Sequence, residues 1–257
     1  DPIFALDNDN DADQTVTFGL TDSSHESTDR EFKGKVYLSD SGTNTVEVSS
    51  NSASGDYAKT QILSGVISGS SGGTAQAGSA KLKKTGVGRL QLTGANTFNG
   101  GVDIDDGALV VGNNTGAGSG TVTINKGKLE VSSAKTMANT IQGGSSNSKK
   151  SIIGGKGTVS SNLIIGDASG EIDVLAPGQG ISTSLTETTG LSKNQAPLGN
   201  VHAGGVADSI GTFSTTGNLT LAGGGVFDWE IKDFHGGSAG SDWDVLAFNN
   251  LTFDAFG

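Results

Sequence analysis

An apolar–x–apolar triplet recurs every 19 to 20 residues between residues 82 and 131. Two interleaved sets of triplets follow this period. One set consists of Leu90–Leu92, Leu109–Val111 and Leu129–Val131. The other consists of Val102–Ile104 and Val122–Ile124. Alternate side chains of a strand point to the same face, so each triplet places two apolar side chains on one side. A unit of this length cannot enclose a core and must stack on its neighbours. The period therefore predicts an all-β chain folded as a single-stranded, right-handed parallel β-helix, or β-solenoid.

Glycine is abundant and proline is rare, with 42 and 3 residues among the 257. A disordered chain would also be rich in glycine, but it would lack spaced triplets of Val, Ile and Leu. No long run of residues follows helical spacing. Gly112 and Gly166 come directly after apolar triplets, and Gly94 and Gly223 follow a triplet after one further residue. We expect them to supply the positive φ that tight turns between strands require.

The charge and the missing cysteine exclude several classes of function. The formal net charge is −11, and the only arginines are Arg30 and Arg89. This balance argues against a nucleic-acid partner and against electrostatic attraction to anionic lipid. The absence of cysteine excludes disulfides, thiolate catalysis and cysteine-based zinc sites. No apolar run approaches the roughly 18 residues of a transmembrane helix, so we expect no direct membrane insertion by this segment.

Both ends of the sequence suggest a piece of a longer protein. The chain begins at Asp1-Pro2 without a Met, so we expect that a leader has been removed or left out. Leu251 and Phe253 predict another inward-facing strand close to the last residue. Solenoids need capped ends, so we expect this end to be covered by further rungs or by another copy.

A stretch of about 31 residues, 82–112, carries several linked motifs. It contains Lys84-Thr85-Gly86, Gly94-Ala95-Asn96-Thr97-Phe98 and Gly100-Gly101 between its triplets. In this combination it resembles the passenger-associated transport repeat, also called the autotransporter-associated β-strand repeat. A looser resemblance to related proteins covers 176–178 and 210–221, but residues 182–209 interrupt it, which is a departure from the usual pattern.

The resemblance implies a secreted or surface-displayed bacterial β-helix. In autotransporters such repeats lie in the passenger domain and assist its folding as it is exported through the outer membrane. A related repeat also occurs in large secreted proteins. The expected localisation is therefore the extracellular space or the bacterial cell surface.

We expect four regions along the chain. Residues 1–75 would form an N-terminal cap with irregular first strands, and 76–181 the regular solenoid with the transport-type repeat at 82–112. Residues 182–209 would form an inserted loop, and 210–257 the C-terminal rungs. Insertions in solenoids map to one face and often carry contacts, so the inserted loop is the first candidate for an interaction surface.

Asp7, Asp9, Asp11 and Asp13 alternate near the N-terminus and are weak candidates for calcium binding. Calcium takes six to eight oxygen ligands, which such spacing could offer. The segment fails as an EF-hand loop, because Ala12 stands where Gly is needed and Phe18 where Glu is needed. A solvated acidic segment is the alternative. We expect no other cofactor.

Two groups of acidic residues are candidates for carbohydrate chemistry. Asp103 and Asp105 share the outer face of one strand, and Asp106-Gly107 predicts a turn. Close carboxylates can raise a pKa for acid catalysis, but polar residues are also usual on the outer face of the repeat. Trp229, Asp242, Trp243 and Asp244 are the better candidates for contact with a ligand, because an aromatic ring beside acids suits sugar binding. Trp243 could instead cover the solenoid end.

Other polar residues are interpreted as structural. His25, His202 and His235 lie in no recognisable catalytic or metal motif, and the lysines, including Lys83-Lys84, are read as scattered or in turns. With so few bases we expect no catalytic residue. Asn113, Asn218 and Asn250 begin Asn-x-Thr sequences, and stacked Asn and Thr side chains are expected to form ladders.

Two functions remain open. The first is a non-enzymatic structural stalk, adhesin passenger or assembly subunit, with self-association, other surface proteins or glycan as partners. The alternative is a β-helix enzyme that acts on polysaccharide as a lyase or hydrolase, which would need acids, bases and aromatics in one groove.

Overall fold

The structure is a computed structural model of the 257-residue chain. It describes residues 3–6, 13–20, 30–40, 43–50, 60–71, 74–76, 79–145, 151–166, 168–178, 210–232 and 237–254. The expected inserted loop at 182–209 lies outside these ranges. Within them, no helix is long and apolar enough to cross a membrane.

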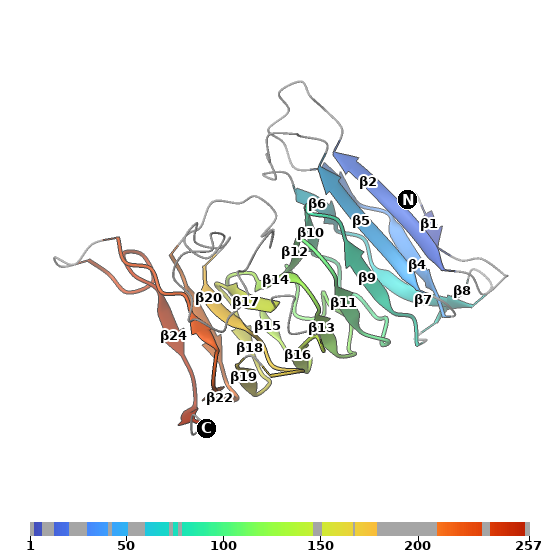
Figure 1. Ribbon diagram of the computed structural model, residues 1–257. Helices are drawn as coiled ribbons and strands as arrows, with labels where there is room; N and C mark the ends of the chain where they lie inside the picture. Colours follow the sequence, from blue (N-terminus) through green and yellow to red (C-terminus); the bar gives the residue numbers. More distant parts are fainter. Residues whose placement is uncertain are drawn as a thin grey trace.

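The chain forms an all-β parallel solenoid, as predicted. Successive strands lie side by side along one axis, with the N-terminal rungs at one end and the C-terminal rungs at the other (Figure 1). Every pair of named strands is parallel except β7–β8. Each rung crosses three faces in turn, and we call these the first, second and third face.

The first face consists of two sheets. A six-stranded sheet forms it in the earlier rungs, and a three-stranded sheet forms it in the later rungs. The six strands are β2 (Gln14–Leu20), β5 (Asn44–Ser50), β9 (Leu82–Thr85), β11 (Val102–Ile104), β13 (Val122–Ile124) and β16 (Ile141–Gly143). The later three are β19 (Leu163–Ile165), β22 (Asn218–Leu221) and β25 (Asn250–Phe253).

The second face is the longest, an eight-stranded sheet. Its strands are β3 (Arg30–Phe32), β6 (Thr60–Leu63), β10 (Arg89–Leu92), β12 (Ala108–Val111), β14 (Gly127–Val131), β17 (Ser151–Gly155), β20 (Val174–Pro177) and β23 (Val226–Phe227).

The third face holds two four-stranded sheets. The first contains β1 (Ile3–Leu6), β4 (Lys35–Ser39), β7 (Ile67–Ser71) and β8 (Thr74–Gln76). The second contains β15 (Thr136–Met137), β18 (Thr158–Val159), β21 (Thr212–Thr215) and β24 (Val245–Ala247).

The predicted triplets form the core in the expected register. On the second face, Leu90 is paired with Leu109, Leu109 with Leu129 and Leu129 with Ile153. All these side chains are buried, as are the paired valines and isoleucines of β11 and β13. Fully burying such a side chain stabilises the fold by about 1.5–3 kcal/mol. Stacked columns of aliphatic side chains therefore supply the cohesion between rungs.

The expectation for the glycines that follow the triplets is wrong. None of Gly94, Gly112, Gly166 and Gly223 has a positive φ. Gly94 is instead required by close approach, because a Cβ there would lie 2.2 Å from the Gly65 carbonyl oxygen. The turns with positive φ lie at other glycines, of which Gly86, Gly107 and Gly127 connect the first face to the second.

Buried asparagines hold the backbone at other corners. Asn96 accepts a hydrogen bond from the Ile67 amide at 2.8 Å and donates one to the Gly116 carbonyl at 2.6 Å. Its amide therefore connects three successive rungs. Asn139 donates to the carbonyls of Gly118 and Gly120 in a similar way.

The last described rung continues the register and leaves apolar side chains exposed. Leu251 is paired with Leu219 and Phe253 with Leu221, as the predicted inward-facing strand requires. Leu219 is fully buried, whereas Leu251, Phe253 and Phe227 are exposed. These three side chains are paired in register with inward-facing leucines of the preceding rung, but they lie at the edge of the described chain.

Candidate functional site

Lysines at the start of β9 and directly before it form ion pairs with acids of β11 and its following turn, on the outside of the first face. Lys81 Nζ lies 2.6 Å from Asp103 Oδ2, and Lys83 Nζ lies 2.7 Å from Asp105 Oδ2. Asn125 of the following rung donates to Asp105 Oδ1 at 2.7 Å. Asp103 lies on β11 and Asp105 directly follows it, and each carboxylate contacts an ammonium group. The geometry is that of a ladder of ion pairs between rungs.

The ladder shifts the pKa of one of its lysines. The hydrogen bond with Asp105 raises the pKa of Lys83 above its ordinary value. Burial opposes this rise, and the charges of Asp105, Asp103 and Asp13 add to it. Lys83 is therefore held in its ammonium form.

Lys84, the next residue, points into the solenoid and is fully buried. It is paired in register with Val46 on one side and Ile104 on the other, so it occupies a column of aliphatic residues. The reading of Lys83-Lys84 as turn residues is wrong, because both lie in β9. The alternation Leu82-x-Lys84 beside Val102-x-Ile104 could have located this side chain.

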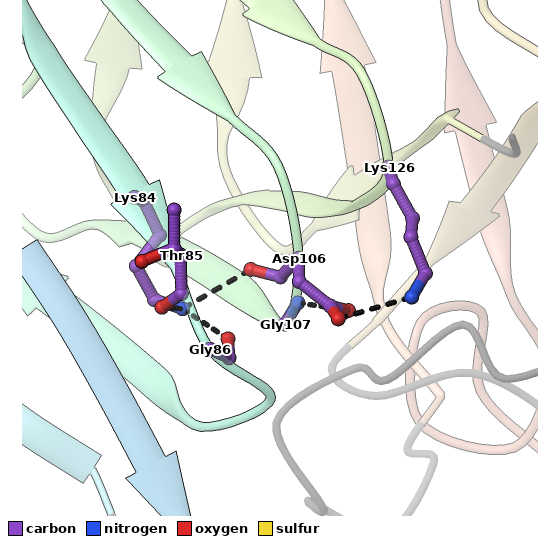
Figure 2. A network of polar contacts seen from close by, with 6 residues as sticks. All are labelled: Lys84, Thr85, Gly86, Asp106, Gly107 and Lys126. Atoms are coloured by element: carbon purple, nitrogen blue, oxygen red, sulfur yellow. Dashed lines mark hydrogen bonds and ion pairs between the residues drawn. The ribbon is translucent and has the colours of Figure 1, made fainter. Parts of the chain in front are cut away.

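The Lys84 amine lies at the corner between the first and second faces (Figure 2). It donates hydrogen bonds to the carbonyls of Thr85 at 2.7 Å, Gly86 at 2.7 Å and Asp106 at 3.1 Å. The Asp106 carboxylate accepts instead from Lys126 Nζ at 3.0 Å and from the Gly107 amide at 2.8 Å. This corner network joins three successive rungs.

Burial lowers the pKa of Lys84 to about 7. The negative charges of Asp106 and Glu47 oppose the shift without cancelling it. An amine with a pKa near neutrality could in principle act as a base. Here the side chain is closed off from solvent and surrounded by carbonyl acceptors, so the arrangement is not open to a substrate.

A second charged cluster lies on the outside of the second face. Arg89 of β10 forms an ion pair and hydrogen bond with Glu130 of β14, across β12, and Lys128 Nζ lies 3.8 Å from Glu130 Oε1. All three side chains are buried, and Lys128 also donates to the Gly178 carbonyl at 3.4 Å. Buried charges are costly unless paired, so this cluster ties its strands together. Sequence reasoning missed it.

A small cavity of about 130 Å³ lies beside this cluster. Its polar lining includes Glu130, Ser132, Ser133 and Lys156. Its size suits a few water molecules or one small polar group.

The structure brings Trp229 and Asp244 together near the C-terminal edge. The Trp229 indole donates to the Asp244 backbone carbonyl at 2.7 Å, while about half of its side-chain surface stays exposed. The Asp244 carboxylate is buried and accepts from the amides of Gly211 at 2.8 Å and Glu230 at 3.1 Å. The Asp244 carboxylate therefore connects the backbone at Gly211 with the backbone at Glu230.

Asp242 and Trp243 also have local structural partners. Asp242 Oδ2 accepts from the Ser238 amide at 2.7 Å. Trp243 forms isolated bridges with Ile231 and Ala239. Of the four proposed contact residues, Trp229 presents the largest exposed aromatic surface.

The calcium candidates are mostly outside the described residues. Asp7, Asp9 and Asp11 fall there, as do His25, His202 and His235. Asp13 Oδ1 accepts a hydrogen bond from the Thr43 amide at 2.7 Å. Among the residues the structure describes, no group of three or more His, Asp or Glu side chains is placed to hold a metal ion.

The expected asparagine ladder is present at the first face of the late rungs. Asn218 is paired in register with Asn250, whose side chain donates to Asn218 Oδ1 at 2.9 Å. The Asn218 amide in turn donates to Asn162 Oδ1 at 2.8 Å. Asn113 lies elsewhere and donates to the Thr93 carbonyl at 3.3 Å.

Comparison with known proteins finds a family match for one part of this arrangement. Neither a curated protein nor a solved structure matches the chain significantly. The strands β9 to β12 coincide with the stretch that contains the Lys84 corner, Arg89 and Asn96. This stretch, residues 82–111, matches the family model of the passenger-associated-transport-repeat.

Proposed function

We propose that this chain is a structural rod within the passenger of an autotransporter, displayed on the bacterial surface or released outside the cell. The match at residues 82–111 supports an exported passenger. The observation that carries the structural role is that charged side chains in and beside the repeat form contacts between rungs. Lys81, Lys83, Lys84 and Lys126 contact the adjacent rung, and Arg89 contacts Glu130 two rungs away.

This pattern favours a rod over a catalyst. The acids that could serve polysaccharide chemistry, Asp103, Asp105, Asp242 and Asp244, each accept from a lysine or a backbone amide. An enzyme of the lyase or hydrolase type would need such groups free to meet a substrate. Partners of the rod are proposed to be further copies of the chain or other surface proteins.

Contact with glycan is a second candidate, and one observation favours it. The Trp229 ring is fixed by its hydrogen bond to Asp244 and remains half exposed. A rigid aromatic surface is suited to stacking against a sugar ring. An adhesin passenger would combine this contact with the rod.

One experiment separates these possibilities. The full chain is incubated with a panel of bacterial and host polysaccharides, and both retained protein and new chain ends are measured. The rod predicts no new ends. New ends that disappear in Asp242→Asn would replace this proposal by the enzymatic one. Retention lost in Trp229→Ala and kept in Phe248→Ala, another exposed aromatic, would establish the adhesin.

Surface display is tested in the bacterium that makes the protein. Antibodies against the chain should label intact cells or appear in the medium fraction, with a periplasmic protein as the negative control. Labelling only after the outer membrane is opened would contradict the proposed location.

A further inference from the structure

The outer side of the second face carries aliphatic side chains as well as the charged cluster. Alternate residues of a strand point to opposite sides, so the sequence neighbours of the core residues Leu109, Ile153 and Leu175 face outward. Each of the aliphatic ones is 3% exposed or less. We call these residues the outer patch, and they are Ala108, Val110, Ile152, Val174 and Ala176. The outer patch is therefore buried on the side of the sheet that faces away from the interior.

The strands of the outer patch also differ in sequence from those of the first face. The strands β11 and β13 read Val-Asp-Ile and Val-Thr-Ile, with a polar residue facing outward. By contrast, β12 reads Ala-Leu-Val-Val and β20 reads Val-Leu-Ala-Pro. Continuous apolar runs are typical of parallel strands that are covered on both sides. Among the described strands, the main neighbours of β12, β14, β17 and β20 are their sheet partners and strands of the other two faces.

The chain leaves the described structure and returns to it beside the outer patch. Gly178 follows β20 directly, and its amide donates to the Gly155 carbonyl at 2.8 Å. Its carbonyl accepts from Lys128 Nζ, on the outer side of the sheet, at 3.4 Å. Gly211 lies against Gly178, because a Cβ at Gly211 would be 3.1 Å from the Gly178 Cα. The intervening residues 179–209, which lie outside the described ranges, therefore begin and end at this patch.

We propose that the outer patch is the docking surface for residues 179–209 of this same chain. The length is sufficient, because four strands about 4.8 Å apart span about 15 Å, and about 30 extended residues reach about 100 Å. Such a segment can cross the patch and return. The insertion is then an integral part of the rod, and its contact is with the solenoid that carries it.

The composition of this segment matches the surface. The charged cluster beside the outer patch has two cations, Arg89 and Lys128, and one acid, Glu130. Residues 179–209 contain two acids and one lysine, which is the complementary balance. They also supply aliphatic side chains that the patch can bury, namely Ile181, Leu185, Leu191, Leu198, Val201 and Val206. Burial of apolar area on both partners favours this contact.

Single introduced thiols test the proposal, because the chain contains no cysteine. Each is placed in the full chain and in a chain whose residues 180–209 are replaced by a short Gly-Ser linker. Val110→Cys probes the outer patch, Val111→Cys the interior beside it, and Ile164→Cys an exposed outward position. We expect a thiol reagent to modify Val110→Cys about 100-fold faster in the shortened chain, since local opening of a packed region is rare.

The other two thiols are the matched controls. Val111→Cys should react slowly and Ile164→Cys rapidly in both chains. The rates are compared at concentrations where light scattering shows a monomer. Equal rates for Val110→Cys in the two folded chains, whether slow or fast, would overturn the proposal, because residues 180–209 would then not protect the patch.

A crosslink in the full chain covers the case in which the shortened chain does not fold. Gln91 is half-buried at the rim of the outer patch and is paired in register with Val110. Gln91→Cys, labelled with a benzophenone maleimide and irradiated, should crosslink to peptides from residues 179–209 of the same molecule. The same label at Ile164→Cys, on the first face, should not reach them. Crosslinks from Gln91→Cys to a second copy, or only to other parts of the chain, would refute the proposal.

Discussion

Arg89 on β10 pairs with Glu130 on β14 and reaches across β12, which lies between them. Most bonds in a solenoid join adjacent rungs, whereas this pair joins rungs that do not touch through their backbones. Together with the Lys84 corner and Asn96, it concentrates polar bonds in the stretch that matches the transport repeat.

Breaking this pair should destabilise the chain strongly. Glu130→Gln leaves Arg89 and Lys128 buried without their carboxylate, and we expect a loss of about 3–5 kcal/mol in the free energy of unfolding. Denaturant unfolding of Glu130→Gln, Arg89→Met and the double variant gives the coupling energy. Single variants that change stability by less than about 0.5 kcal/mol, or effects that simply add, would contradict the role of the pair.

Stability should depend on pH through Lys84. Its pKa is lowered from 10.5 to about 7 on folding, so the unfolded chain binds the extra proton between these values. The wild type should therefore gain stability relative to Lys84→Met as the pH rises from 7 towards 10, by up to about 1.4 kcal/mol per unit. Equilibrium unfolding of both proteins at pH 6, 7, 8 and 9 tests this, and a constant difference over the series would contradict it.

Gly107 should tolerate no side chain. Its φ is +70°, and a Cβ would lie 2.3 Å from the Gly88 carbonyl oxygen and 2.5 Å from that of Gly86. For Gly107→Ala we expect about 1–2 kcal/mol from the backbone conformation and about 1–3 kcal/mol more from overlap.

Gly170 is the matched control for this change. Its φ is +87°, but a Cβ there would meet nothing within 4 Å. Gly170→Ala should therefore show the conformational cost alone in thermal or denaturant unfolding. Equal losses at the two positions would mean that close packing at the corner does not matter.

Asn96→Ala should loosen the third face. The change removes the partners of the Ile67 amide and the Gly116 carbonyl, both bonded to the buried side chain. Each buried group left without a partner costs about 1–3 kcal/mol. Asn99→Ala, at an exposed position three residues later, serves as the control in the same unfolding assay, and an equal effect there would refute the connecting role of Asn96.

The sequence predicted the fold because its apolar positions follow one period. Leu90, Leu109 and Leu129 could be aligned without any structure, since each triplet alternates and each repeat has nearly the same length. The inward position of Phe253 was predicted on the same basis.

The polar sites were harder to predict, because their chemistry depends on neighbours that the sequence does not place. Glu130 lies two rungs from Arg89, and only the folded register brings their side chains together. Lys84 was misread because lysine is rarely buried, although its place in the alternation pointed inward. The glycines after the triplets were misassigned because close approach to a neighbouring rung, as at Gly94, requires glycine as strongly as a positive φ does.

The ladder of lysines and acids on the first face bears on how such a chain can evolve. A precise deletion of residues 102–121 would keep the aliphatic register, because Leu82 could then pair with Val122 as it now pairs with Val102. Lys81 and Lys83 would meet Thr123 and Asn125 in place of Asp103 and Asp105. The aliphatic positions of these repeats are interchangeable, whereas the outward-facing side chains differ from repeat to repeat, so gain or loss of a whole repeat requires new partners on the outside.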